Sequence, residues 1–418
     1  MGGRDKPGHD ECLEARDAMK ALIIGGSIAG LFAALLLRRR GIDVVVCERA
    51  RSELSGRGAG IATHPQILDV LELLGLDTRG LGITIDARRM FGRDGKLVAE
   101  HRRRQVMTSW DRLFTLLRAD LPGSCYRQGQ EFIRAEQRGG AVTAHFADRS
   151  TATADVVIGA DGLRSSVRAA TLANDPLRYA GYVAWRALAP EQSFPRALHR
   201  DLFDAMGFCL PSGEQMVGYP VAGPGNDLRP GHRRYNIVWY RPADEATLAR
   251  LLTDVTGQRH EVSIPPPLVA EAVVVELLAA ADALLAPQFR DVVSLAERPF
   301  LQPIYDIEVP RMCAGRIALI GDAAFVARPH VGAGVAKAAQ DAMVLADALA
   351  TGSEVESALH AFESARLPIG RRIVMRARDL GAAMQARHAS ERERAMAERY
   401  RKPDAVLVDT ATLDFLTA

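Results

Sequence analysis

The segment 21–48 constrains the fold of this chain more than any other part of its sequence. Residues 21–24 form a short apolar run, residues 25–30 read Gly-Gly-Ser-Ile-Ala-Gly, and residues 44–47 are apolar again. Between the two runs, Leu31, Phe32, Leu35 and Leu36 recur at helical spacing within 28–40, and Gly41 follows where helices commonly end. The order strand, glycine turn, helix, strand predicts a βαβ unit in a parallel sheet.

The glycine turn also has the spacing of a dinucleotide-binding fingerprint. The usual pattern is G-x-G-x-x-G after a strand, with an acidic residue about 20 positions further on. Here Ser27 replaces the middle glycine, and Glu48 closes the second strand, where its carboxylate can accept hydrogen bonds from an adenosine ribose. A glycine turn beside a surface glutamate is the alternative. The residues expected to hold the adenosine half are Gly25, Ser27, Ile28, Ala29, Gly30, Glu48 and Arg49.

Two further strand-turn-helix corners follow far along the chain. Residues 155–158 lead to Asp161 and a helix start with Arg164 and Arg168, which are candidate phosphate contacts. Residues 317–320 lead to Gly-Asp-Ala-Ala-Phe-Val-Ala-Arg-Pro-His-Val-Gly at 321–332 and then to a helix of small residues. Asp161 and Asp322 can accept hydrogen bonds from ribityl hydroxyls, and the helix N-terminus favours negative charge, as on a flavin ring. Each corner alone could be only a capped helix. The residues expected beside the ring are Pro329, Gly332, Ala333 and Gly334.

Composition excludes several function classes. The chain of 418 residues is 48% hydrophobic and 25% charged with a net charge of +2, so nothing in it calls for nucleic acid as a partner. No apolar run reaches about 18 residues, so no membrane span is expected. Five widely spaced cysteines form no metal pattern and no evident disulfide framework, which favours a reducing cytoplasm. Residues 1–19 are polar and are expected to be a disordered extension.

The order of these patterns predicts an α/β protein. A Rossmann-like nucleotide-binding domain with a parallel sheet is expected at 20–177 and 309–350, and it is therefore discontinuous. An inserted substrate domain with a mixed sheet is expected at 178–308, where aromatic residues concentrate, and a helical C-terminal region at 351–418. Within the first domain, residues 107–121 are expected to form a helix.

Several motifs, taken in order, resemble the class A flavin-dependent aromatic hydroxylases. They are GGSIAGL (25–31), LSGRGAGI (54–61), TSWD (108–111), GYVAWR (181–186), FRDVV (289–293) and GDAAFVARPHVGAGVAKAAQDA (321–342). The resemblance covers the chain from about residue 20 to about residue 380. Within the family, these motifs are most similar to the enzymes that act on N-heteroaromatic, pyridine-type rings.

The resemblance implies an activity and its cofactors. The expected reaction is hydroxylation of a small electron-rich aromatic ring, with non-covalent FAD, NAD(P)H and O2, through a flavin C4a-hydroperoxide. It implies no separate nicotinamide-binding domain, and family habit allows a homodimer. It also implies that Gly60, Ile61 and Trp110 lie against FAD, although many relatives carry Arg where Trp110 stands and His where Phe325 stands. Epoxidation, oxidative decarboxylation or hydride transfer on the same fold, and a flavin carrier without turnover, stay open as alternatives.

Three residues are candidates for the substrate site. His330 follows Pro329 beside the expected ring and could bind the substrate or help to deprotonate its hydroxyl, since an imidazole titrates near neutral pH; capping the next helix is its alternative. Tyr219 could point a phenol at the substrate or simply pack in the core. Arg186 could bind an anionic substrate, and a structural ion pair is the alternative. We therefore take His330 and Tyr219 as candidate catalytic residues, and both with Arg186 as candidate substrate contacts.

Overall fold

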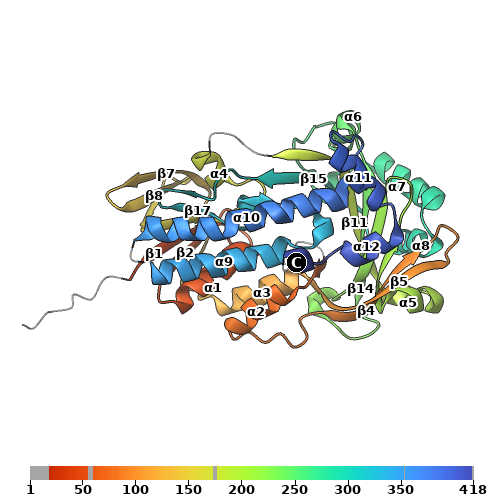
Figure 1. Ribbon diagram of the computed structural model, residues 1–418, viewed down its shortest axis with the longest axis horizontal. Coiled ribbons are helices and arrows are strands. Elements are labelled where there is room, and N and C mark those ends of the chain that lie inside the picture. The colour runs from red at the N-terminus through yellow and green to blue at the C-terminus, as the bar shows by residue number, and fades with distance from the viewer. Residues whose placement is uncertain (1–17, 55–59, 173–176, 353, 417–418) are drawn as a thin grey trace, which may run out of the picture.

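The computed structural model describes residues 18–54, 60–172, 177–352 and 354–416 (Figure 1). The expected extension at 1–19 lies outside the described residues except for its last two positions. Two large sheets lie at opposite ends of the molecule, and the long helix α10 (Val355–Gly381) contacts strands of both (Figure 1). Of the described helices, none is long and apolar enough to cross a membrane. Within the same ranges, His, Cys, Asp and Glu form no group of three or more that could hold a metal ion.

The first sheet is the predicted parallel sheet, and β1 lies at its centre. Its strands, in spatial order, are β16 (Cys313–Ala314), β17 (Ile317–Leu319), β10 (Val156–Gly159), β1 (Lys20–Ile24), β2 (Asp43–Glu48) and β6 (Tyr126–Gln128). All neighbours pair in parallel except β16 with β17. The apolar runs that mark these strands are buried, as expected for a parallel sheet covered on both faces.

Helices cover one face of this sheet. The helix α1 (Ile28–Arg39) packs on α9 (Gly334–Thr351) and α3 (Trp110–Asp120), and α9 in turn contacts α2 (Pro65–Leu73) and α10 (Val355–Gly381). A small antiparallel sheet of β7 (Phe132–Arg138), β8 (Ala141–Phe146) and β9 (Thr151–Ala154) contacts β1, β10 and α4 (Ser166–Thr171). Because α9 comes from residues far beyond α1, this packing brings the 321–334 turn to the carboxyl end of β1.

The second sheet has nine strands and mixed pairing. In spatial order they are β18 (Phe325–Val326), β15 (Phe300–Glu308), β11 (Arg178–Pro190), β14 (Arg234–Pro242), β13 (Gln215–Val221), β12 (Ala205–Cys209), β4 (Ile83–Phe91), β5 (Leu97–Ser109) and β3 (Gly60–Ala62). The pair β4 and β12 is parallel, and the other pairs are antiparallel. The nine strands therefore come from both sides of residue 177.

Two expectations about the first 177 residues are corrected here. Residues 107–121 are not one helix, because Met107 pairs with Ala62 across β5 and β3, and Ser109 caps α3 by accepting a hydrogen bond from the Arg112 backbone N–H. The boundary expected at 177/178 also does not separate the two sheets, since β3, β4 and β5 belong to the second one. The strand pattern of β5 is weak in the sequence, because this strand begins with exposed apolar residues and continues through a run of arginines.

Alternation along the strands gives the second sheet two different faces. On β11, Val183 and Trp185 belong to one hydrophobic core with α5 (Arg196–Leu202), α7 (Glu271–Leu284) and α8 (Pro287–Leu295), as do Ile237 and Trp239 on β14. The even-numbered neighbours of these residues, such as Tyr182 and Tyr240, face the other core, which continues into the first sheet. The side chains that point toward the first domain are therefore the even-numbered ones on β11 and β14.

The C-terminal part of the chain returns to the junction of the two sheets. The helix α12 (Pro403–Asp409) follows α11 (Glu391–Arg399) and packs on β4 and β5. The helix α6 (Glu245–Leu251) belongs to the second domain. The guanidinium of Arg88, on β4, is fully buried and donates to the backbone carbonyl oxygens of Leu407, Thr410 and Ala411. The side chain of Gln105 accepts a further bond from Arg88. Ala411 has a φ of 49°, in the left-handed region, so this segment is held in a conformation that an alanine adopts only under constraint.

Arg88→Met is expected to lower the free energy of unfolding by about 2–4 kcal/mol, because buried carbonyl oxygens lose their donor. Hydrogen exchange measured by mass spectrometry should show the loss first at 403–416. Arg102→Met is the matched control, since Arg102 lies exposed on the paired strand β5. Equal exchange at 403–416 in both variants would show that Arg88 does not hold this segment.

Candidate active site

A first cavity lies at the carboxyl ends of β1, β2 and β10. Among the residues that line it are Gly25, Ser27, Ile28, Ala29, Glu48, Arg49, Trp110, Asp161, Asp322 and Gly334. The N-terminus of α1 opens into this cavity, and its cap residue, Ser27, makes no side-chain capping bond. The hydroxyl of Ser27 and the first N–H groups of α1 are therefore available to an anionic ligand.

The glycines of the turn are required by close backbone contacts. Gly25 has a φ of 107°, and a Cβ atom there would lie 2.4 Å from the Ala160 carbonyl oxygen. A Cβ atom on Gly30 would lie 1.9 Å from the Gly25 carbonyl oxygen, which no adjustment of a side chain could relieve. Gly30 therefore allows the backbone of the turn to pack closely on the start of α1. It is the one predicted residue of this motif that does not line the cavity.

Glu48 lines the first cavity and also fixes the loops around it. Its two carboxylate oxygens accept hydrogen bonds from the Gly26 and Ala50 backbone N–H groups, each at 2.8 Å. The carboxylate is buried, yet each oxygen keeps a second lone pair for a ligand hydroxyl. Trp110 stacks on Phe114 at 4.8 Å between ring centroids, which presents a flat apolar wall to the same cavity.

Asp161 lines the first cavity, whereas Arg168 does not. The carboxylate of Asp161 lines the first cavity, where it accepts bonds from the Ser165 hydroxyl and the Val167 backbone N–H, and burial raises its pKa. The guanidinium of Arg168 is buried instead and donates to the carbonyl oxygens of Ala323 and Leu163. The prediction that Arg168 meets a phosphate is therefore wrong, because this side chain ties α4 to the 321–323 turn.

Asp322 lies where two cavities meet. It lines the first cavity and a second one, as Gly334 and Val335 do. The side chain of Asp322 is exposed to the two cavities. The surrounding protein removes water from the carboxylate and so raises the pKa of Asp322, and the positive charge of Lys337 opposes this with a smaller effect. The turn itself is anchored, because the Gly321 N–H donates to Asp341, which Arg366 binds at 2.8 Å.

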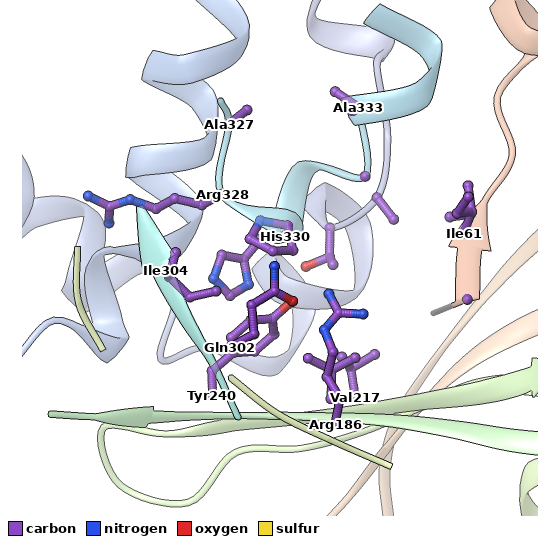
Figure 2. A pocket seen from close by; sticks show the side chains of 18 of the residues that line it. Ile61, Arg186, Val217, Tyr240, Gln302, Ile304, Ala327, Arg328, His330 and Ala333 are labelled. Atoms are coloured by element: carbon purple, nitrogen blue, oxygen red, sulfur yellow. The ribbon is translucent and has the colours of Figure 1, made fainter. Parts of the chain in front are cut away.

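The second cavity lies between the nine-stranded sheet and the 329–334 turn. It is lined by seven residues that the sequence assigns to the cofactor, Gly60, Ile61, Asp322, Pro329, Gly332, Ala333 and Gly334, and by the three substrate candidates, Arg186, Tyr219 and His330. The helix α9 starts here, after Gly332 turns the chain with a φ of 65°. Figure 2 shows Arg186 and Gln302 pointing from the sheet, and His330 from the turn, into the same space.

Arg186 reaches this cavity without a protein counter-charge. The Nε of its guanidinium is buried and makes no hydrogen bond, and none of the carboxylates in the described ranges pairs with it. The structural ion pair that was the alternative for Arg186 is therefore not formed by the described residues. The Nε2 of Gln215, which also lines the cavity, is buried and has no partner either. An unpaired buried donor of this kind costs about 1–3 kcal/mol, which a ligand acceptor would recover.

His330 is buried and hydrogen-bonded on one side only. Its Nε2 lies 2.9 Å from the Tyr182 hydroxyl, while its Nδ1 is buried with no hydrogen-bond partner. Burial, aided by the charges of Arg328 and Arg186, lowers the pKa of His330 to about 3. The imidazole is therefore neutral at physiological pH, and the expectation that it titrates near neutral pH is not met in the protein without ligand.

Tyr219 and Gly60 shape one wall together. A Cβ atom on Gly60 would lie 2.4 Å from the Tyr219 ring, so the missing side chain makes room for the phenol. Burial raises the pKa of Tyr219 to about 12, and the phenol is therefore protonated at neutral pH.

Comparison with known proteins fits this geometry. Residues 18–176 and 301–377 match the family model of an FAD binding domain, and residues 179–306 match an FAD binding domain-like model. The chain is 32% identical over 369 residues to the 2,6-dihydroxypyridine 3-monooxygenase of Paenarthrobacter nicotinovorans, which covers 87% of this chain and 91% of that protein. The chain belongs to the FAD-dependent aromatic monooxygenases.

The chain is also similar to further proteins over most of its length. It is 28% identical over 341 residues to the 6-hydroxynicotinate 3-monooxygenase of Pseudomonas fluorescens, which covers 78% of this chain and 81% of that protein. The structure of 2,6-dihydroxypyridine-3-hydroxylase from Arthrobacter nicotinovorans matches with a TM-score of 0.83 at 29% identity, over 90% of this chain and 96% of that one. The expected family, α/β fold and FAD cofactor are confirmed, with NAD(P)H as the co-substrate.

The residues of the first cavity fit FAD. The N-terminus of α1 and the free Ser27 hydroxyl suit a pyrophosphate, and the lone pairs of Glu48 suit a ribose. Asp322, at the meeting of the cavities, is placed to accept hydrogen bonds from the ribityl chain, with the N-terminus of α9 beyond it. The ring of the cofactor would then face the second cavity of the monooxygenase.

Asp322→Ala is expected to weaken FAD binding at least about tenfold, because a charge-assisted hydrogen bond contributes about 1.5–3 kcal/mol. The ratio of flavin absorbance to protein absorbance after purification measures the loss. Asp282→Ala, an exposed carboxylate on α7, is the matched control. A variant that purifies with full flavin would remove Asp322 from the cofactor site of the monooxygenase.

Three residues of the site had no separate signal in the sequence. Tyr182 and Gln302 come from the long strands β11 and β15, and Ala411 lies in the C-terminal segment; none belongs to a nucleotide motif. Ala411 donates its backbone N–H to the His330 carbonyl oxygen at 2.8 Å. In the sequence, Tyr182 belongs to the GYVAWR motif and to the aromatic residues concentrated after residue 177, and neither pattern assigns it an individual role.

Proposed function

We propose that the substrate of this FAD-dependent monooxygenase is a small hydroxylated N-heteroaromatic ring, bound as an anion in the second cavity. The relatives named above act on 2,6-dihydroxypyridine and 6-hydroxynicotinate, and both are pyridine rings with ionisable oxygen substituents. The proposal rests chiefly on Arg186, whose unpaired guanidinium points into the cavity next to the cofactor site.

The cavity suits a flat ring with polar edges. Apolar walls come from Ile61, Val217 and Ile304, and aromatic walls from Tyr219 and Tyr240. The polar groups that point inward are chiefly donors, with Arg186 on one side and His330 on the other. A neutral hydrocarbon ring would leave these donors unpaired, whereas a ring with ionised oxygen satisfies them.

When bound, FAD supplies the electrons of the reduced nicotinamide to O2 and delivers one oxygen atom to the substrate. The protein binds the ring beside the cofactor, and the positive charge of Arg186 lowers the pKa of a substrate hydroxyl. An ionised hydroxyl makes the ring electron-rich, which the transfer of an electrophilic oxygen requires. We assign Tyr219 and the neutral His330 to holding the ring oxygens, and the buried walls to excluding water.

We also propose that the enzyme is cytoplasmic and works as a monomer or a homodimer, without nucleic acid or membrane. Light scattering of the FAD-loaded protein after size-exclusion chromatography tests the assembly.

The substrate class is tested by stopped-flow reduction of the FAD-loaded enzyme with NADH and with NADPH. A panel of mono- and dihydroxypyridines, hydroxynicotinates and phenols should include members that accelerate flavin reduction and gain one oxygen atom by mass. Matched methoxypyridines, which cannot ionise, should do neither. Acceleration by the methoxy compounds, or peroxide as the product of every ring, would refute the proposal and favour another flavin reaction on this fold.

A further inference from the structure

The hydrogen-bond partners behind His330 determine which of its nitrogen atoms carries the proton. The guanidinium of Arg328 lies beside the Tyr182 ring, with its central carbon 5.6 Å from the ring centroid. Gly381 packs against both groups, since a Cβ atom there would lie 2.4 Å from the hydroxyl oxygen and 3.1 Å from a guanidinium nitrogen. Arg328 is itself held in place, because it binds Asp306 through two nitrogen atoms and Gln385 through a third.

A guanidinium can only donate, so the neighbouring Arg328 offers no acceptor to the Tyr182 hydroxyl. Its own proton must then find an acceptor, and the Nε2 of His330 lies 2.9 Å away. If Nε2 carried the imidazole proton, a fully buried phenol O–H would be left without a partner, at a cost that buried groups avoid. Nε2 is therefore the acceptor, and the single proton of the neutral imidazole sits on Nδ1.

That Nδ1 is buried and has no partner among the described residues. Figure 2 shows the imidazole pointing into the second cavity next to Gln302, with Arg186 on the other side, while Arg328 points away from them. The Tyr240 ring packs on the imidazole at 4.1 Å between centroids, which limits its rotation. The N–H therefore faces the space that a substrate would occupy.

We propose that Tyr182 is a positioning residue that locks His330 as a neutral Nδ1–H donor to an oxygen of the substrate, so that His330 is not the base that deprotonates it. This inference rests on the proposed function and specifies the chemistry of the same cavity. The substrate must present a hydrogen-bond acceptor to His330 and another to Arg186. Such a ring carries two oxygen substituents that are both acceptors, as an oxyanion, a carbonyl or a carboxylate.

The tautomer can be read directly in the FAD-loaded enzyme. We would label the protein with ¹⁵N-histidine and assign His330 among the 10 histidines by its absence in His330→Asn. The expected spectrum has a protonated Nδ1 and an unprotonated Nε2, and Tyr182→Phe should move the proton toward Nε2. Tyr179→Phe is the matched control, since this tyrosine of the same strand donates to the Ala243 carbonyl oxygen instead. A protonated Nε2 in the unmodified enzyme, or an unchanged tautomer in Tyr182→Phe, overturns the proposal.

Binding supplies a second readout that a purely structural role would not produce. The probe is 2,6-dihydroxypyridine, titrated into the enzyme and followed by the flavin absorbance. Tyr182→Phe should raise its Kd about tenfold, whereas the control Tyr179→Phe should leave it unchanged. The amide nitrogen of an asparagine can replace Nδ1, whereas that of a glutamine reaches the place of Nε2. His330→Asn should therefore bind the probe at least about tenfold more tightly than His330→Gln.

The outcomes separate the two proposals. If the tautomer is as described but no hydroxypyridine binds, the locked imidazole stands and the substrate class is wrong. If hydroxypyridines are hydroxylated but His330→Gln binds as well as His330→Asn, the substrate class stands and the role of Nδ1 is wrong.

Discussion

Arg186→Gln should lose at least about thirtyfold in affinity for an anionic hydroxypyridine while it keeps its full content of FAD. Removing one member of a buried, hydrogen-bonded charge pair costs about 2–5 kcal/mol. In the free protein Arg186 has no such partner among the described residues, so its loss should fall on the ligand and not on the fold. Titration of the flavin absorbance gives Kd, and steady-state rates give kcat/KM.

Arg178→Gln controls for the loss of a positive charge, since Arg178 begins the same strand but is exposed. Arg186→Lys should recover part of the affinity, because charge is restored without the planar fork. An Arg186→Gln enzyme that binds and hydroxylates the ring normally would contradict an anionic substrate site at this position.

Gly30→Ala should abolish the binding of FAD. The added Cβ atom would lie 1.9 Å from a backbone carbonyl oxygen, so the start of α1 must move away from the end of β1. The N–H groups of α1 and the Ser27 hydroxyl then leave the place where a pyrophosphate would lie. We expect a colourless protein with a lower thermal midpoint, measured by absorbance and calorimetry.

Gly123→Ala is the control for this substitution, because a Cβ atom there meets nothing within 4 Å. It should purify with the same flavin content as the unmodified enzyme. A yellow Gly30→Ala protein with normal stability would falsify the close packing of α1 on β1.

The cofactor side of the site could be predicted because its signals are local. The expected strand at 21–24 and helix at 28–40 are Lys20–Ile24 and Ile28–Arg39 in the structure. Each nucleotide corner is a strand, a turn and a helix start within some fifteen consecutive residues, and backbone sterics alone restrict which residues can occupy such a turn.

The substrate side could be predicted only in part, because its contacts join distant segments. Tyr182 and His330 touch across 148 positions of sequence, and no spacing rule links them. Arg88 reads as one more charged residue of a basic chain, yet it is fully buried beneath carbonyl groups that lie 319 to 323 residues away. The strand β5 was missed for the same reason, since its pairing with β3 and β4 rests on tertiary context and not on its own pattern.

The anchoring of the C-terminal segment has a consequence for how the enzyme is made. Thr410 and Ala411 line the second cavity, so the pocket lacks part of its wall until the ribosome has synthesised them. The three corners of the cofactor site, with the helix α9 that packs the last of them on α1, are complete by residue 351, roughly sixty codons earlier, and nascent chains fold as they emerge. We therefore expect the cofactor site to form before the substrate pocket as the chain is synthesised. Stalled or prematurely terminated chains would accumulate as yellow proteins that hold the cofactor but do not bind the ring.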